Sequence, residues 1–205
     1  MKKISILFLA MTFMMCQQET PSNKDFTTQF EKSGGTETPE YKDVISYYKD
    51  LSNTYSEISL FEMGATDSGN PLHIVVFNSD GKIALKDIKN SSKNRMLINN
   101  GIHPGESDGI DASMMLLRDI VQNDSLKKVY QNTIITVIPI YNIGGSITRN
   151  STTRANQNGP LEYGFRGNAR NLDLNRDFMK CDSKNAKSSQ TRRFRLSFIR
   201  KTRKN

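Results

Sequence analysis

The sequence predicts an α/β fold in which helices pack on the faces of a sheet. Two observations support this prediction. Apolar residues recur at helical spacing in residues 39–53 and again in residues 108–122. Short apolar runs typical of strands lie between these two segments and after the second one. Helical and strand patterns therefore alternate along one chain, which favours an α/β sheet with helices on its faces.

The first predicted helix follows a polar N-terminal stretch. Residues 17–38 are polar and contain a Ser-Gly-Gly run, which indicates a tether. Thr38 is a typical helix cap, and Pro39 suits the first helical turn. The helix over 39–53 is therefore predicted to be amphipathic. Its apolar face comprises Tyr41, Val44, Ile45, Tyr48 and Leu51.

Four strands are predicted, at residues 58–63, 72–78, 95–99 and 133–140. An Asp-Ser-Gly-Asn-Pro turn separates the first strand from the second. Residues 86–94 are polar and are predicted to form a loop. The last of the four runs is the strongest candidate for a central strand. The second helix, over 108–122, carries an apolar face of Ile110, Met114, Leu117 and Val121.

Composition and charge limit the class of protein. The chain has 205 residues, of which 36% are hydrophobic and 24% charged, so collagen-like and disulfide-rich classes are excluded. No apolar run reaches the roughly 20 residues of a membrane-spanning helix. The net charge of +8 comes from residues 181–205, which hold nine Lys or Arg and one acid, whereas residues 1–180 are balanced. The charge therefore does not indicate a nucleic-acid partner.

The N-terminus has the shape of an export signal. A basic start is followed by the apolar run 4–15 and then by Cys16. This pattern resembles a bacterial lipoprotein signal, in which the cysteine becomes lipidated, and it predicts a signal over 1–16 and a membrane anchor at Cys16. We then expect an exported protein of the cell envelope, periplasmic or outer-membrane, or a secreted one. The alternatives are another kind of signal and a buried apolar strand.

The first candidate for a functional segment is the turn Gly101–Glu106, between a buried strand and a helix. His103 and Glu106 are spaced so that an imidazole nitrogen and a carboxylate can face one metal ion, and these ligands suit zinc. Sites in α/β proteins gather at the carboxyl ends of strands. A catalytic zinc also needs a third protein ligand. The alternative interpretation is a surface turn.

The second candidate is a long loop between residues 139 and 180, rich in Gly and Asn. Loops of this length are usually functional or disordered. Planar guanidinium groups recognise carboxylates through paired hydrogen bonds, so the loop suits a substrate with a free carboxylate. Its arginines are Arg149, Arg154, Arg166, Arg170 and Arg176.

Together these segments resemble the zinc carboxypeptidases of the carboxypeptidase A type over residues 39–187. The resemblance implies a partial three-layer α/β/α fold with a mixed sheet, from which the C-terminal half is missing. It also implies hydrolysis of C-terminal peptide bonds in a peptide or peptide-like substrate with a free C-terminal carboxylate. The stretches that carry it are GATDSGNPLHIVVF, INNGIHPGESDG, VIPIYNIGG and NLDLNRDF.

The resemblance implies a role for individual residues. His103 and Glu106 match two ligands of one Zn²⁺ ion. Asn175 and Arg176 match the pair that holds the terminal carboxylate of the substrate. Arg154 matches the arginine that polarises the scissile carbonyl group, and the alternative for it is a solvated loop charge.

Arg166 is the second candidate for the carbonyl-polarising role. The remaining functional groups of the family lie downstream of the Asn-Arg pair and are not found here. The sequence has two histidines, and the other one, His73, is predicted to be a strand or loop residue. No acid follows Asp182. We therefore expect a zinc site without its third ligand and without the catalytic glutamate, weak metal binding, impaired activity and an exposed sheet edge.

Residues 188–205 form a basic tail that does not continue the resemblance. The tail predicts a truncated or frameshifted reading frame, and the alternative is a genuine basic tail that binds anionic lipid. Two other functions remain open. One is an amidase or deacylase on the same scaffold. The other is a non-enzymatic, lipid-anchored protein that binds through its cationic tail.

Overall fold

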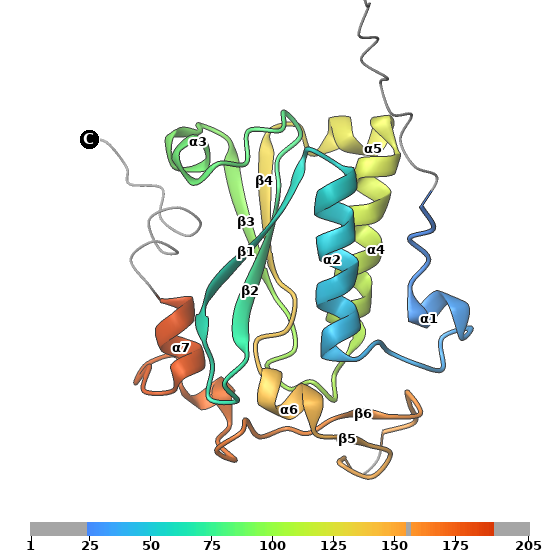
Figure 1. Ribbon diagram of the computed structural model, residues 1–205, viewed down its shortest axis with the longest axis vertical. Coiled ribbons are helices and arrows are strands. Elements are labelled where there is room, and N and C mark those ends of the chain that lie inside the picture. Colours follow the sequence, from blue (N-terminus) through green and yellow to red (C-terminus); the bar gives the residue numbers. More distant parts are fainter. Residues whose placement is uncertain (1–23, 155–156, 191–205) are drawn as a thin grey trace, which may run out of the picture.

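The fold is that of a computed structural model, which describes residues 24–154 and 157–190. A four-stranded sheet lies at its centre, with helices on both sides (Figure 1). The strands are β1 (Ile58–Ala65), β2 (Pro71–Phe77), β3 (Asn94–Asn99) and β4 (Thr133–Ile138). Their order is β1-β2-β4-β3, in which only the β3–β4 pair is parallel. The prediction of an α/β fold with a mixed sheet is therefore confirmed.

Two long helices cover one face of the sheet. They are α2 (Tyr41–Thr54) and α4 (Asp108–Gln122), which lie side by side in Figure 1. Alternate side chains of β2 and β4 point toward these helices because successive strand residues face opposite sides. The resulting core joins Val44, Tyr48, Leu51, Val75, Phe77, Met114, Leu117, Ile135 and Val137, among others.

The opposite face is covered by shorter elements. Helix α3 (Leu85–Asn90) contributes Ile88, and the 3₁₀ turn η1 (Leu174–Arg176) contributes Leu174. Helix α7 (Lys184–Ser189) packs against β1 and β2. This second core also contains Leu72, Ile74, Val76, Ile134, Ile138 and Tyr141.

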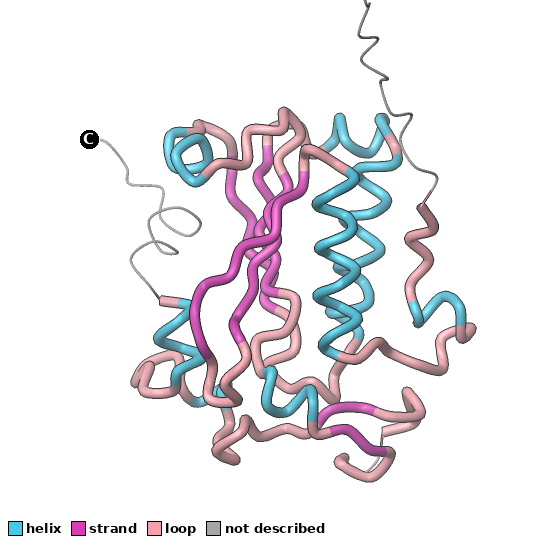
Figure 2. Tube along the Cα trace, in the orientation of Figure 1, coloured by secondary structure: helices cyan, strands magenta, loops and turns pink. Residues whose placement is uncertain are grey.

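The remaining elements are small. Helix α5 follows α4 directly, and α6 leads into a two-stranded ribbon of β5 and β6 that lies below the sheet (Figure 2). Of the arginines noted in the sequence, Arg149 begins β5, Arg154 lies in the loop between β5 and β6, and the others follow β6. Their bounds are α5 (Asp124–Val129), α6 (Ile143–Ile147), β5 (Arg149–Asn150) and β6 (Tyr163–Gly164).

Two segments differ from the sequence-based prediction. Part of the predicted loop 86–94 belongs to α3, which forms because Ile88 inserts into the second core. The described part of the predicted tether, from residue 24 to 38, packs on the domain. Phe26 is 4% exposed within the first core, and Thr28 caps helix α1 (Gln29–Lys32) through a reciprocal bond with Glu31.

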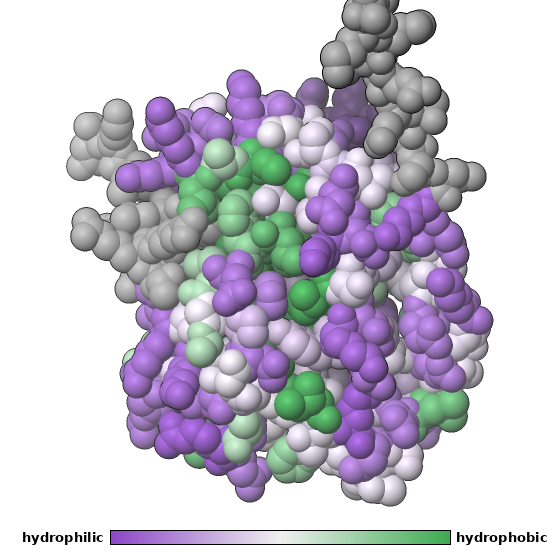
Figure 3. Space-filling view, in the orientation of Figure 1, coloured by the Kyte–Doolittle hydropathy of each residue, from purple (hydrophilic) through white to green (hydrophobic). Residues whose placement is uncertain are grey.

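Strand β3 forms one edge of the sheet. Met96 and Leu97 on this strand are 45% and 40% exposed, which are large values for strand residues of this size. In Figure 3 apolar surface gathers over the strands, whereas the lower part of the molecule is mostly polar with smaller apolar patches. Among the described helices, none is both long and apolar enough to cross a membrane.

Several predictions fall on residues that the structure does not describe. The predicted signal over 1–16, with Cys16, lies outside the described residues, as do residues 191–205 of the basic tail. The predicted boundary between residues 187 and 188 falls inside α7, where Ser188 and Ser189 are both buried.

Candidate metal centre

The candidate site begins at the carboxyl ends of the two parallel strands. Gly101 follows β3 with a φ of +61°, a conformation that glycine adopts without strain. The amides of Tyr141 and Asn142 donate to the carbonyls of Asn100 and Gly101 at 2.8 and 2.9 Å. These bonds fix the turn after β3 to the chain that leaves β4. The following residues, up to the start of α4, therefore have a defined position at the end of the sheet.

His103 lies in this turn and is 7% exposed. Its Nε2 lies 2.9 Å from Oδ1 of Asp173, and its Nδ1 lies 3.5 Å from Oε1 of Glu106. The two ring nitrogens therefore have partners on opposite sides of the ring. An ionised Asp173 can only accept a hydrogen bond, so Nε2 carries the proton and, in a neutral ring, Nδ1 keeps its lone pair on the side of Glu106.

Asp173 links the histidine to the Asn-Arg block. Besides His103, it accepts hydrogen bonds from Arg166 Nη2 and from the amide of Asn175, both at 2.9 Å. The bond from His103 is the main reason why the pKa of Asp173 falls to about 2, with further lowering by Asn175 and Arg166. Asp173 is therefore ionised at neutral pH. Nothing in the sequence distinguished it from the neighbouring Asp177.

Glu106 is paired with an arginine of the long loop. Nη1 of Arg154 lies 2.6 Å from its Oε1, and this hydrogen bond lowers the pKa of Glu106. The loop approaches the turn closely, since a Cβ atom on Gly105 would lie 2.6 Å from Cδ of Arg154. The side chain of Gln157 also donates to the carbonyl of Gly105. Two polar contacts thus join the loop to the turn.

The residues predicted from the sequence fall into two groups. His103, Glu106, Arg154 and Arg166 come together, because Nη1 of Arg166 lies 3.4 Å from Nδ1 of His103. Asn175 and Arg176 follow in η1, where both side chains are exposed. They are connected to the first group through the bond from the Asn175 amide to Asp173 rather than by side-chain contact.

His73 is separate from this group. It lies on β2, where its Nδ1 is 3.3 Å from the hydroxyl of Tyr41. Burial lowers the pKa of His73 and so favours the neutral ring. This position agrees with the prediction of a strand histidine.

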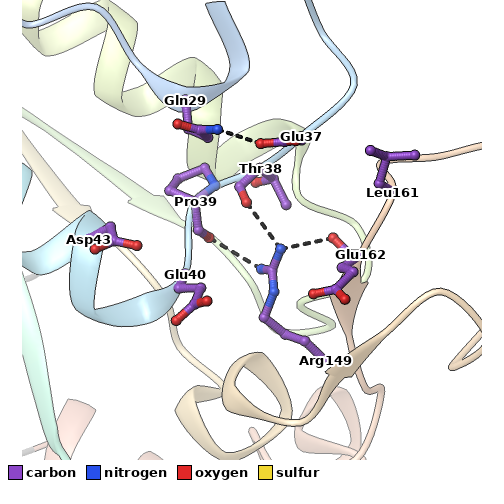
Figure 4. Close-up of a pocket in the computed structure, with 9 residues that line it drawn as sticks. All are labelled: Gln29, Glu37, Thr38, Pro39, Glu40, Asp43, Arg149, Leu161 and Glu162. Atoms are coloured by element: carbon purple, nitrogen blue, oxygen red, sulfur yellow. Dashed lines mark hydrogen bonds between the residues drawn. The ribbon is translucent and has the colours of Figure 1, made fainter. Parts of the chain in front are cut away.

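The arginines of the loop also differ in their roles. Arg149 lies beside a cavity of about 550 Å³ between the N-terminal segment and β6 (Figure 4). Its guanidinium group donates to the carbonyls of Thr38, Pro39 and Glu162. Arg149 therefore joins the segment before α2 to the ribbon, and its guanidinium group has a structural role.

The donor atoms fit part of a zinc site. Two ligands at about 2.0–2.2 Å from a tetrahedral zinc ion lie about 3.3–3.6 Å apart. The separation of 3.5 Å between His103 Nδ1 and Glu106 Oε1 agrees with this geometry. However, the described residues contain no group of three or more His, Cys, Asp or Glu arranged to hold a metal ion. Among the residues that the structure describes, His103 and Glu106 are thus two candidate zinc ligands without a third beside them.

A family model described as zinc carboxypeptidase matches residues 44–196, which is most of the chain. The mixed α/β fold agrees with this match. The chain belongs to the zinc carboxypeptidase family. The match extends to residue 196, beyond the limit of 187 that the sequence motifs suggested.

Solved structures show the same fold. A metallo-carboxypeptidase from Burkholderia cenocepacia superposes with a TM-score of 0.55 at 19% identity, over 73% of this chain and 36% of that protein. Proteins described as carboxypeptidases from Burkholderia mallei ATCC 23344 and Shewanella denitrificans OS-217 give TM-scores of 0.51 and 0.52 at 22% and 21% identity. Each match covers 69% of this chain and 32% of the other protein. The chain thus spans about a third of the length of these structures. No curated protein matches it.

Proposed function

We propose that this chain contributes the His-Glu half of the metal centre of a zinc-dependent metallocarboxypeptidase, which hydrolyses C-terminal peptide bonds. The arrangement of His103 carries the proposal. Its Nε2 lies 2.9 Å from Asp173, while its Nδ1 lies 3.5 Å from Oε1 of Glu106, a separation that would suit two ligands of one zinc ion. Zinc, when bound, supplies Lewis acidity that polarises a carbonyl group.

The arginines and Asn175 would bind the substrate. Arg176 and Asn175 are exposed on η1, a turn fixed by buried Leu174 and by the bond from the Asn175 amide to Asp173. A guanidinium fork next to an amide suits the free carboxylate of a peptide C-terminus. Arg154, next to Glu106, is positioned to stabilise negative charge that develops on the scissile carbonyl oxygen.

Arg166 is the alternative for this charge-stabilising role. Its Nη2 is bonded to Asp173 at 2.9 Å and its Nη1 lies near His103, so its head group is held in place beside the metal-facing atoms. We further propose that zinc binding by this chain is weak and its activity impaired. The support is the ligand count, because His73, the one other histidine of the sequence, lies on β2 beside Tyr41.

The experiment that tests this function is a zinc titration of the purified full chain and of His103→Gln. We expect saturable binding by the parent chain and its loss in the variant, because glutamine removes the imidazole ligand. The variant Asp124→Asn, on α5 at the far end of the molecule, is the control and should bind as the parent does. Equal binding by the parent and His103→Gln would refute the proposed site.

A substrate panel then separates the enzymatic alternatives. Peptides with a free C-terminus should be cleaved faster than the same peptides with a C-terminal amide, since only the free carboxylate suits the Asn175–Arg176 pair. Hydrolysis of acylated amino acids or cell-wall peptides in preference to ordinary peptides would favour the amidase or deacylase. Zinc-independent, salt-sensitive binding to anionic vesicles without any hydrolysis would favour the non-enzymatic protein.

We also propose that the chain is exported and anchored to a membrane through Cys16, as a lipoprotein of the cell envelope. The basic start, the apolar run 4–15 and the cysteine directly after it support this proposal. Cys16→Ser should shift the protein from the membrane fraction to the soluble fraction and abolish the incorporation of labelled fatty acid. The companion variant Cys181→Ser should change neither. Labelling that persists in Cys16→Ser would contradict the proposal.

A further inference from the structure

The metal-facing atoms of His103 and Glu106 both contact arginines. Oε1 of Glu106 lies 2.6 Å from Nη1 of Arg154, and Nδ1 of His103 lies 3.4 Å from Nη1 of Arg166. These are the same two atoms whose separation fits a zinc ion. A guanidinium group bonded to Oε1 and a divalent cation bound to the same oxygen would repel each other across a few ångströms.

The two arginines are held in different ways. Arg166 forms an ion pair of its own with Asp173 at 2.9 Å, so its partner is neither of the two proposed metal ligands. For the guanidinium group of Arg154, the structure shows Glu106 as the partner. The main chain of Arg154 is anchored separately, because its carbonyl accepts from the hydroxyl of Tyr163 at 3.1 Å. The side chain can therefore leave Glu106 while the loop stays in place.

We propose that Arg154 competes with the metal ion for Glu106 and so regulates metal binding at this site. The inference rests on the proposed zinc site. Arg154 holds the carboxylate of Glu106 through a contact of 2.6 Å, and it must move its guanidinium group aside when the metal binds. Its side chain is 25% exposed, so solvent is accessible to the displaced group. The ion pair between Arg154 and Glu106 thus lowers the affinity for the metal and also keeps Glu106 in position.

The size of this effect is limited by the exposure of Glu106, whose side chain is 54% exposed. Ion pairs that are open to water contribute little, typically about 0.2–1 kcal/mol, which corresponds to about 1.4-fold to 5-fold in a binding constant. Salt screens such pairs. We therefore expect a modest increase in zinc affinity when Arg154 is neutralised, and the increase should shrink as the ionic strength rises.

The test is an isothermal titration of the full chain with Zn²⁺, for the parent, Arg154→Gln and Arg170→Gln. Arg154→Gln should bind about 1.4 to five times more tightly than the parent at low salt. The control Arg170→Gln removes another arginine of the same loop, one that pairs with Asp67 at 3.9 Å, and should leave the affinity unchanged. Unchanged or weaker binding by Arg154→Gln would overturn the inference.

Two further measurements keep the test decisive. Arg154→Lys retains the positive charge and should bind zinc as the parent does, whereas a purely structural role of Arg154 would give the same change in both variants. If Arg154→Gln does not fold, the zinc affinity of the parent chain is measured at rising ionic strength instead. Salt screens the ion pair between Arg154 and Glu106, so competition predicts that Arg154 opposes zinc binding less as salt is added. His103→Gln separates the proposed zinc site from the proposed competition by Arg154. If His103→Gln loses zinc binding but Arg154→Gln does not bind zinc more tightly, only the competition is refuted.

Discussion

Replacing Phe77 by alanine is expected to lower the free energy of unfolding by about 3–5 kcal/mol. Phe77 is fully buried at the end of β2, opposite Ile58 on β1 and Ile135 on β4. Its ring fills the core between the sheet and the helices α2 and α4. Truncation removes apolar contacts and leaves a cavity that the surrounding elements can fill only in part. This loss is a large share of the total free energy of unfolding, which is about 5–15 kcal/mol for native proteins.

Urea denaturation of the full chain, followed by far-UV circular dichroism, measures this loss. The matched control is Met96→Ala on the edge strand β3, whose side chain is 45% exposed and should cost much less. Similar losses in both variants would mean that the sheet is not packed against α2 and α4 as the structure shows.

The parts of the fold that could be predicted are those with a periodic pattern. Helices α2 and α4 and all four strands are present close to the predicted residues. Both helices and the strands β2 and β4 bury several side chains each, whereas β3, which was predicted to be a buried strand, is an edge strand with no buried residue. Helix α3 was missed because a single residue, Ile88, is buried in it. The N-terminal segment was missed for the same reason, since Phe26 is the one buried hydrophobic residue among residues 24–38, and the residues of its core cluster lie far along the chain.

The site could be predicted only where a local motif defines it. His103 and Glu106 are three residues apart, so their spacing is visible in the sequence. The partner of His103 is not, because Asp173 lies 70 residues away. The arginines of the loop also look alike in the sequence. Only their contacts show that Arg149 bonds to backbone carbonyls, whereas Arg154 pairs with Glu106 and Arg166 pairs with Asp173.

Asp173 should have a large effect on the metal site although it is not placed as a ligand. A histidine that binds a metal through one nitrogen usually donates from the other to a carboxylate, which fixes the tautomer and the ring orientation. Asp173 occupies this position at 2.9 Å from Nε2 of His103. Asp173→Ala is therefore expected to weaken zinc binding by about 10-fold to 100-fold, as is typical when such a partner is removed. Zinc titration of the full chain measures the loss.

Two variants of Asp173 separate an effect on the orientation of His103 from a loss of stability of the whole protein. Asp173→Asn keeps an oxygen that can accept from Nε2 of His103 but lacks the charge, so its zinc affinity should lie between those of the parent and Asp173→Ala. Asp173 also accepts from Arg166 and from the amide of Asn175, and both variants therefore require a urea midpoint beside each titration. If the zinc affinity and the urea midpoint fall together in both variants, the role of Asp173 is to stabilise the fold. A loss in Asp173→Ala at an unchanged midpoint, with Asp173→Asn in between, assigns it to the orientation of His103.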